Sequence, residues 1–256
     1  MKITDTHTHL YMKQFDDDRD FIIKKAIHNG IDKFYLPSID HSTITKIVKL
    51  EKKYPNICFS MIGLHPSKVH PYNFKKELKN IEKWFHKHSF SAIGEIGMDL
   101  HLEKKFFFEQ EYVLKHQIQW VKNTNLPIII HCRKAFDPLF NILSKEKNFI
   151  IKGIFHCFSG TLEQAQKIID FGLKLGIGGM ITFKKNPISS FIKKIDLKNI
   201  VLETDSPYLS PHPFRGKRNE PIYIKIILKK LSKIYSISEK KISEIINLNV
   251  KKLFLS

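Results

Sequence analysis

The chain has 256 residues, of which 42% are hydrophobic and 27% are charged. A chain of this length buries about three quarters of its unfolded surface, so it folds without disulfide bonds or a structural metal, and its composition excludes intrinsic disorder, collagen-like repeats and small disulfide frameworks. Lys and Arg number 43 against 25 Asp and Glu, which gives a net charge of +18. Such a charge suits a polyanionic partner or an anionic membrane surface. Only four of the 43 basic residues are Arg, however, and a bias toward AT-rich codons explains the excess of Lys equally well.

Short apolar runs alternate with longer amphipathic stretches along the whole chain, as in repeated β-α units. Eight runs are predicted to be strands: residues 2–5, 33–37, 57–63, 92–95, 127–131, 152–156, 173–178 and 200–205. Segments with the periodicity of helices lie between the strands. In one of them an apolar residue recurs every three or four positions, so that these residues share one buried face: Ile224, Leu228, Leu231 and Tyr235. A further helix is predicted over residues 238–255.

Eight strands separated by helices in about 250 residues match an α/β fold of the (β/α)8, or TIM, barrel type. The competing doubly wound sheet normally has fewer strands and places its ligand at a single switch point. No linker rich in Pro, Gly or Ser interrupts the pattern. We therefore expect one domain over residues 1–256.

The cysteines and the apolar runs bear on the compartment. Three Cys, an odd number without a C-x-x-C pair, indicate a reducing environment. No apolar stretch is suited to a signal peptide or to a membrane span. We expect a cytoplasmic protein without membrane association, and no obligate protein partner is evident from the sequence.

Polar residues fall at or just after the ends of five predicted strands, where the chemistry of a barrel is placed. They are His7, His9, Glu95, His131, His156 and Asp205. In a closed barrel these positions converge on one mouth. Four imidazoles and two carboxylates are predicted to bind divalent metal cations, two in number.

The spacing of these residues suggests a role for each. His7 and His9 stand at i and i+2 of an extended segment, so both imidazoles point the same way. Glu95 can bridge two cations, since a carboxylate has one oxygen for each, and Asp205 can accept the proton of the attacking water. Glu95 and Asp205 are therefore the predicted catalytic residues. The ligand set suits Zn or Mn, whereas phosphate chemistry often uses Mg, so the metal is left open among the three.

The histidines, and the cysteines and glycines near them, also have interpretations other than metal binding. Any one of the histidines alone is more often a hydrogen-bonded structural residue than a ligand; six residues at five strand ends favour the metal site. Cys132 and Cys157 each follow a predicted ligand directly, and because neighbours on a strand face opposite sides, both thiols are expected to face the helices. The glycines within residues 175–179 are expected to let backbone or substrate approach the seventh strand closely.

Seven segments together resemble the TatD family of metal-dependent hydrolases and deoxyribonucleases, among the amidohydrolase-like barrels. The segments are DTHTHL (5–10), GLHP (63–66), GEIGMD (94–99), LP through HCR (126–133), HCFSG (156–160), ETDSPYL (203–209) and RGKRNEP (215–221). The resemblance implies metal ligation by the six residues found at the strand ends. It also implies cleavage of DNA phosphodiester bonds, often as an exonuclease.

The resemblance also makes Arg133, Arg215 and Arg218 candidates for holding phosphate, and the planar guanidinium fork suits phosphate oxygens. His65 is expected either to contact substrate or to stabilise the turn before Pro66. The chain departs from the family pattern in two places. Phe214 precedes Arg215 where the family commonly has His, and after Asp99 come Leu100 and His101 where relatives often carry Tyr.

The sequence therefore predicts a metal-dependent hydrolase, most simply a deoxyribonuclease of the 3′–5′ exonuclease kind with DNA as its substrate. A metallohydrolase of another phosphoester, or of an ester or amide such as an aminoacyl-nucleotide linkage, would use the same activated water. A nucleic-acid-binding barrel without turnover is the alternative outside enzymes. The complete ligand set weighs against it.

Overall fold

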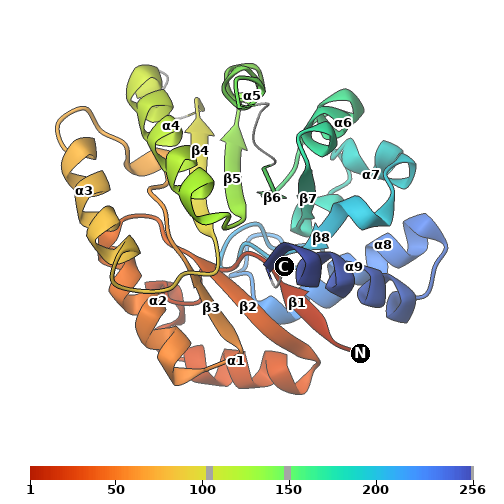
Figure 1. Ribbon diagram of the computed structural model, residues 1–256. Helices are drawn as coiled ribbons and strands as arrows, with labels where there is room; N and C mark the ends of the chain where they lie inside the picture. The colour runs from red at the N-terminus through yellow and green to blue at the C-terminus, as the bar shows by residue number, and fades with distance from the viewer. Residues whose placement is uncertain (102–105, 147–150, 255–256) are drawn as a thin grey trace.

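In the computed structural model, which describes residues 1–101, 106–146 and 151–254, eight parallel strands form the centre and helices surround them (Figure 1). The strands are β1 (Ile3–Asp5), β2 (Ile31–Pro37), β3 (Cys58–Met61), β4 (Ile93–Asp99), β5 (Ile128–Arg133), β6 (Gly153–Phe155), β7 (Leu173–Ile177) and β8 (Ile200–Leu202). All eight predicted strands are present. Their spatial order follows their order in the chain.

Two seams close the strands into a barrel. Between β3 and β4, Ile62 bridges to Ile93, and the backbone N–H of Gly94 donates to the Ile62 carbonyl at 2.8 Å. Between β1 and β8, the backbone N–H of Thr6 donates to the Leu202 carbonyl at 3.0 Å. Because both seams are hydrogen-bonded, the predicted (β/α)8 barrel is confirmed.

Helices connect consecutive strands on the outside of the barrel. They are α1 (Arg19–His28), α2 (His41–Lys53), α3 (Phe74–Phe85), α4 (Phe107–Thr124), α5 (Phe136–Ser144), α6 (Leu162–Asp170), α7 (Ile188–Phe191), α8 (Ile224–Tyr235) and α9 (Glu239–Phe254). Capping boxes at Asp40 and Thr161 start α2 and α6. Ile224, Leu228 and Leu231 are buried, which confirms the predicted inner face of α8.

Helix α9 closes the end of the barrel at which the strands begin. Its Asn249 side chain donates to the carbonyls of Leu197 and Ile200 at 2.7 and 2.8 Å, just before and at the start of β8. Asn247 donates to the Lys2 carbonyl, next to β1, at 2.7 Å. The prediction of a helix over residues 238–255 is confirmed up to Phe254; residue 255 lies outside the described residues. The opposite end of the barrel forms the mouth.

Strand β4 runs four residues beyond its predicted end, so Glu95 lies inside the strand and Asp99 ends it. Within this extension, Gly97 is needed for close packing of the backbone. A Cβ at Gly97 would lie 1.9 Å from the His131 carbonyl oxygen of β5, and its φ of +144° also favours glycine.

Strands β6 and β8 end before their predicted limits. β6 stops at Phe155 and β8 at Leu202, so His156 and Asp205 lie in the loops that follow. These loop positions are still at the mouth of the barrel, where the predicted chemistry requires them.

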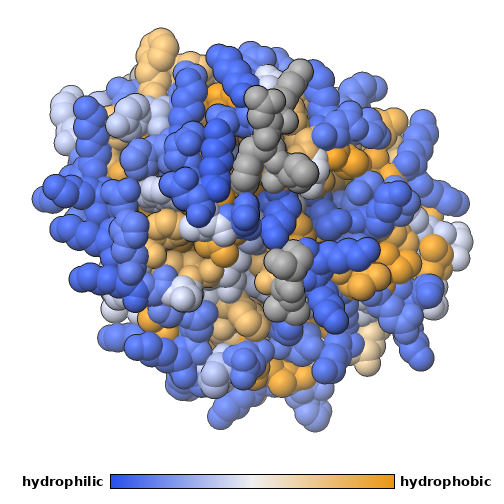
Figure 2. Space-filling view, viewed as in Figure 1, coloured by the Kyte–Doolittle hydropathy of each residue, from blue (hydrophilic) through white to orange (hydrophobic). Residues whose placement is uncertain are grey.

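Hydrophilic side chains cover much of the face shown in Figure 2, with apolar areas between them. This agrees with the surplus of Lys in the composition. In the part of the chain that the structure describes, none of the helices has the length and apolar character to cross a bilayer.

The carboxylate of Asp5 joins β1 to the segment that follows β8. It is fully buried and accepts hydrogen bonds from the backbone N–H of Thr204 at 2.9 Å and from the Thr204 hydroxyl at 2.6 Å. The N–H of His7 also donates to it at 3.3 Å. This one side chain therefore holds the first candidate ligand and the loop of the last one in a fixed relation.

We expect the Asp5→Ala variant to have a free energy of unfolding lower by roughly 2–4 kcal/mol, because each buried donor left without an acceptor costs about 1–3 kcal/mol. Urea denaturation measures this difference. Asp17→Ala, which removes an exposed carboxylate, should change stability by less than about 0.5 kcal/mol. Equal effects of the two substitutions would show that Asp5 does not hold this seam.

Candidate metal centre

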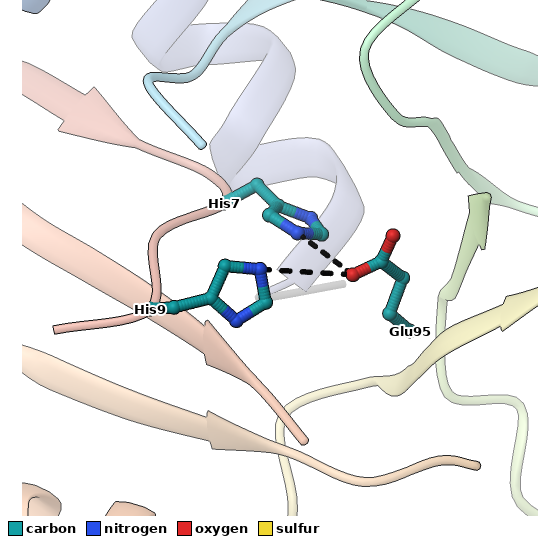
Figure 3. Close-up of side chains that lie close together, drawn as sticks. All are labelled: His7, His9 and Glu95. Carbon is teal, nitrogen blue, oxygen red and sulfur yellow. Dashed lines mark ion pairs between the residues drawn. The ribbon is translucent and has the colours of Figure 1, made fainter. Parts of the chain in front are cut away.

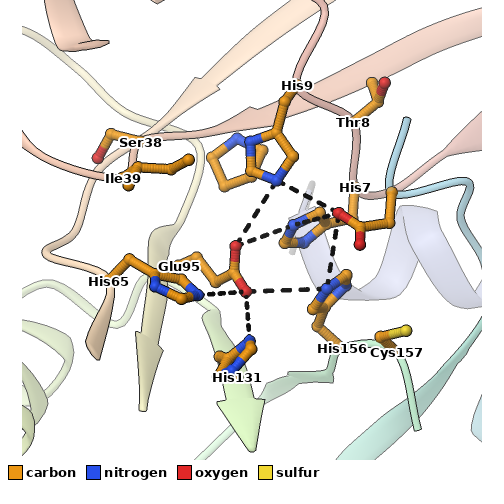
Figure 4. Close-up of polar contacts among 12 residues, drawn as sticks. His7, Thr8, His9, Ser38, Ile39, His65, Glu95, His131, His156 and Cys157 are labelled. Atoms are coloured by element: carbon orange, nitrogen blue, oxygen red, sulfur yellow. Dashed lines mark hydrogen bonds and ion pairs between the residues drawn. The ribbon is translucent and has the colours of Figure 1, made fainter. Parts of the chain in front are cut away.

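Seven polar side chains converge at the mouth of the barrel. Figure 4 labels the histidines and the glutamate among them. Each comes from a strand or from the segment after one: His7 and His9 (β1), His65 (β3), Glu95 (β4), His131 (β5), His156 (β6) and Asp205 (β8). Six of these are the predicted ligands. The structure brings all six together and adds His65 to them.

Glu95 lies at the centre of the cluster, with two imidazoles near its Oε2 and three near its Oε1, of which His156 is the farthest at 3.7 Å. Its Oε2 is 3.2 Å from His7 Nε2 and 3.7 Å from His9 Nε2 (Figure 3). Its Oε1 is 2.8 Å from His131 Nδ1 and 3.2 Å from His65 Nε2. A carboxylate with its donors divided in this way has the arrangement that a bridge between two cations requires.

Asp205 faces the same centre from the loop after β8. Its Oδ1 is 3.3 Å from His9 Nε2, 3.8 Å from His7 Nε2 and 3.9 Å from His156 Nε2. Imidazoles from the segments after β1 and β6 thus face one oxygen of Asp205.

The donor set fits a divalent cation. His7 is fully buried, yet neither of its ring nitrogens has a hydrogen-bond partner, although Glu95 Oε2 is close to one of them. Two donors each about 2.1 Å from one ion lie about 3.0–3.4 Å apart, close to the shorter separations in this cluster. Orphaned buried nitrogens that face carboxylates at such distances are what a site for a cation presents.

The tautomer of His9 supports the same conclusion. Tyr11 donates its hydroxyl hydrogen to the Pro37 carbonyl at 2.7 Å. The same hydroxyl oxygen lies 2.8 Å from His9 Nδ1 and accepts a hydrogen bond from it, because its one hydrogen is already donated. His9 therefore carries its hydrogen on Nδ1 when neutral. This leaves Nε2, the nitrogen that faces Glu95 and Asp205, with a free lone pair for a cation.

His65 stabilises the turn at Pro66, which is one of the two roles considered for it. Its Nδ1 accepts a hydrogen bond from the Ser67 backbone N–H at 3.0 Å and so caps the turn that begins at Pro66. Its Nε2 faces Glu95. The turn fixes the ring, and the ring then presents a second nitrogen to the centre.

Glu203 is a buried carboxylate of the site that the sequence analysis missed. Its Oε1 lies 3.0 Å from His156 Nδ1, at an angle unsuited to a hydrogen bond, and accepts the backbone N–H of Cys157 at 2.6 Å. Gly176 makes room for it, since a Cβ there would lie 2.3 Å from Glu203 Oε2. At Gly179 a Cβ would lie 2.3 Å from the Leu209 carbonyl oxygen, so the expected close approach at these glycines is confirmed.

Asp99 is a second carboxylate that supports a ligand, because its Oδ2 lies 3.3 Å from His131 Nε2. Such outer groups orient a metal-binding imidazole. The period of two in an extended chain could have identified both carboxylates, as Asp99 stands four residues after Glu95 and Glu203 two residues before Asp205.

The expectation that both thiols face away from the site is wrong for Cys157. Its φ is +49°, so the side-to-side alternation of a strand does not extend to it, and its sulfur lies within 4.8 Å of ligand atoms of His156 and Glu203. Cys132 packs against the hydrophobic core but also lines the cavity at the mouth. Burial raises the pKa of Cys132 to about 12 and the pKa of Cys157 well above its ordinary value, so both thiols are neutral.

The charges in the cluster depend on one another. Burial alone would raise the pKa of Glu95, but the surrounding imidazoles, His65 foremost, hold it well below its ordinary value. Burial would lower the pKa of His156, yet Glu203 and Glu95 raise it to about 10. The pKa of His131 is raised in the same way by its carboxylate neighbours. Without a cation, the cluster therefore balances its carboxylates with protons.

A cavity of about 480 Å³, which we call the metal cavity, opens from this cluster to solvent. Arg133, Tyr208 and Leu209 are exposed around it. Arg215 lies in a neighbouring cavity, with its guanidinium carbon 3.8 Å from the ring centre of Phe183. The structure thus brings Arg133 to the candidate centre and places Arg215 beside it.

Arg218 does not reach the metal cavity. Its guanidinium makes two hydrogen bonds to the carboxylate of Asp18, at 2.8 and 2.6 Å, and another to the Gln14 carbonyl at 2.6 Å. It also lies over the ring of Phe15. The Arg218 guanidinium therefore attaches the loop after β8 to the segment before α1. Because these hydrogen bonds use its donors, Arg218 is not among the residues that we propose to hold phosphate.

Comparison with known proteins gives one consistent family. The model of the TatD-related DNase family matches residues 4–255. The chain is 35% identical to the uncharacterized metal-dependent hydrolase YabD of Bacillus subtilis over 98% of both chains, and 27% identical to the 3′-5′ ssDNA/RNA exonuclease TatD of Pantoea ananatis over 98% of both. The crystal structure of YjjV, a TatD homologue from Escherichia coli, superimposes with a TM-score of 0.92 at 27% identity, over 99% of this chain and 98% of YjjV.

We expect cation binding to release protons at about pH 7, since His131 and His156 carry raised pKa values and a cation needs unprotonated nitrogens. Affinity should rise with pH until about 10, by about tenfold per pH unit for each proton displaced. Calorimetric titration of Mn²⁺ into metal-free protein, in two buffers of different ionisation enthalpy, counts the protons.

His156→Gln should reduce the number of protons released, and His28→Gln, which alters an exposed ring on α1, should not. Binding without proton release at any pH between about 6 and 8 would contradict this description of the cluster.

Proposed function

The chain belongs to the TatD-related DNase family of metal-dependent hydrolases, and from this premise we propose that it hydrolyses phosphodiester bonds of DNA. The observation that carries the proposal is the division of the Glu95 oxygens between two groups of imidazoles at a mouth that also presents Arg133. The name of the Pantoea relative supports a 3′–5′ exonuclease that acts on single strands.

We assign the cluster to two divalent cations. His7, His9 and Asp205 would hold one, and His131 and His156, with His65 beside them, the other; Glu95, which is close to both groups, would help to hold both. Bound cations of this kind supply a water that is nucleophilic at neutral pH and stabilise charge on both the attacking and the leaving oxygen.

The side chains around the cluster handle protons and phosphate. The pKa of Asp205 is lowered by His9 and the other imidazoles in spite of burial, so its carboxylate is ionised and can accept a proton from water. Its Oδ1 faces the imidazoles, and we assign the proton to Oδ2. Arg133 is exposed at the rim, where its guanidinium can pair with phosphate oxygens and offset the charge that develops during displacement.

The same cluster could serve an enzyme that hydrolyses another phosphoester, a carboxylic ester or an amide. Arg133 favours an anionic substrate over a neutral ester or amide. A barrel that keeps its cations and binds nucleic acid without turnover would need the same cluster, and it differs from the proposed enzyme in that no cation would bring about cleavage.

We expect metal-stripped protein to leave 5′-labelled single-stranded DNA intact and to shorten it in steps once Mg²⁺, Mn²⁺ or Zn²⁺ is added. Glu95→Gln should lower the rate by at least about a thousandfold, because it removes one of the two shared oxygens. Gel analysis of the labelled products measures both. Glu244→Gln, an exposed change on α9 at the other end of the barrel, is the matched control and should act like the parent.

A ladder of products that needs added cation and is lost in Glu95→Gln would support the nuclease. Absence of cleavage with every cation, while calorimetry still finds cation binding, would contradict it and direct attention to small phosphoesters and aminoacyl esters.

For Arg133→Ala we expect kcat/KM for single-stranded DNA to fall about a hundredfold, the loss typical of removing one stabilising donor. Arg133→Lys should recover part of it, since charge remains while the planar fork is lost. Cation affinity should stay within about twofold in both variants, because neither touches a ligand. A loss of cation binding equal to the loss of activity would assign Arg133 a structural role.

A further inference from the structure

A second cavity, of about 460 Å³, lies beside the metal cavity. Its lining includes Phe183, Lys184, Lys185, His212 and Arg215, and we call it the Phe183 cavity. One wall is the segment between β7 and α7, and the other is the loop between β8 and α8, elements on the same side of the molecule in Figure 1. Both walls follow the C-terminal ends of strands, so this cavity belongs to the mouth of the barrel.

The two walls are attached to each other. The hydroxyl oxygen of Thr182 accepts the backbone N–H of His212 at 2.8 Å, and Gly179 lets the Leu209 carbonyl approach to a distance that a Cβ would not allow. The short helix Gly179–Thr182 also separates the two cavities, since Met180 lines one and Thr182 the other. The shape of the Phe183 cavity is therefore built into the same elements that shape the metal cavity.

The charge of the Phe183 cavity is not neutralised by its own lining. Lys184, Lys185 and Arg215 contribute three cations, and among the described residues that line it there is no Asp or Glu. The Arg215 guanidinium lies 3.8 Å from the centre of the Phe183 ring. This pair differs from Arg218 in the same loop, whose guanidinium is paired with Asp18.

A third cavity, of about 560 Å³, adjoins the first two. It shares Arg133 and Ser159 with the metal cavity and Pro187 with the Phe183 cavity, and Lys134 lines it as well. Glu163 is the one carboxylate in its described lining. Cationic and aromatic groups therefore continue from the candidate metal centre to Phe183 and Arg215.

We propose that the Phe183 cavity is a binding site for single-stranded DNA, which takes the phosphates and a base of the same strand whose bond is cleaved in the metal cavity. Phosphates would pair with Lys184, Lys185 and Arg215, and a base would stack on the exposed face of the Arg215 guanidinium, whose other face covers the Phe183 ring. This proposal rests on the proposed function, because it assumes that the strand cleaved in the metal cavity extends into the Phe183 cavity.

The test compares substrates of different length. The parent protein is assayed on a dinucleotide and on thymidine oligomers of about four, eight and twelve nucleotides, lengths that bracket common single-strand site sizes. KM should fall as the oligomer grows and then level off, while kcat changes little. Binding of a labelled oligomer to metal-free protein, followed by fluorescence anisotropy, gives a second measurement that does not require turnover.

Phe183→Ala and Arg215→Ala should raise KM and Kd for the longest oligomer by about five- to a hundredfold, the range for losing a stacked base. Their KM for the dinucleotide should change at least fivefold less. Arg215→Lys should recover part of the loss, because the charge remains. Lys229→Ala removes one positive charge from the exposed side of α8 and corrects for nonspecific attraction.

The outcomes separate the two proposals. Cleavage that is independent of length, with Phe183→Ala and Arg215→Ala no worse than Lys229→Ala, overturns the site and leaves the nuclease in place. Oligomer binding that both variants weaken, in a protein that cleaves no DNA with any cation, supports the site and overturns the nuclease.

Discussion

The burial of one carboxylate constrains the whole mouth of the barrel. Glu95 is only 3% exposed, and an ion taken out of water loses several kcal/mol of solvation unless other groups replace it. The replacements are imidazoles that arrive from the strands on either side and across the barrel. Since none of them is near Glu95 in the sequence, the carboxylate can be satisfied only when the barrel is closed.

Closure of the barrel alone does not fix the orientation of the imidazole rings. Polar groups behind the rings fix it. Tyr11 sets the tautomer of His9, Glu203 lies behind His156, and Asp5 ties β1 to the loop that carries Asp205. Glycines appear where this second layer needs space, as at Gly176. The site is thus two layers deep, and the outer layer is built from the same strand ends as the inner one.

The part of this arrangement that follows from the sequence is the part that depends on local pattern. Strand periodicity placed His7, His9, His131, His156 and Asp205 at strand ends, and a barrel has only one place where such ends meet. Properties that depend on a distant partner could not be read in this way. Arg218 resembles a substrate contact until Asp18, 200 residues away, is seen to bind it.

The wrong prediction at Cys157 has a similar cause, since the left-handed backbone that turns its sulfur toward His156 leaves no mark in the spacing of apolar residues.

Helix α9 has a consequence for how the protein is made. It contacts the carbonyl of Lys2 and the start of β8, so this end of the barrel is covered only after α9 has left the ribosome. His7 and His9 emerge almost 200 residues before Asp205. A growing chain therefore carries its first donors exposed and incomplete for most of its synthesis, and the capacity to hold a cation arises at the end of folding, as a property of the finished barrel.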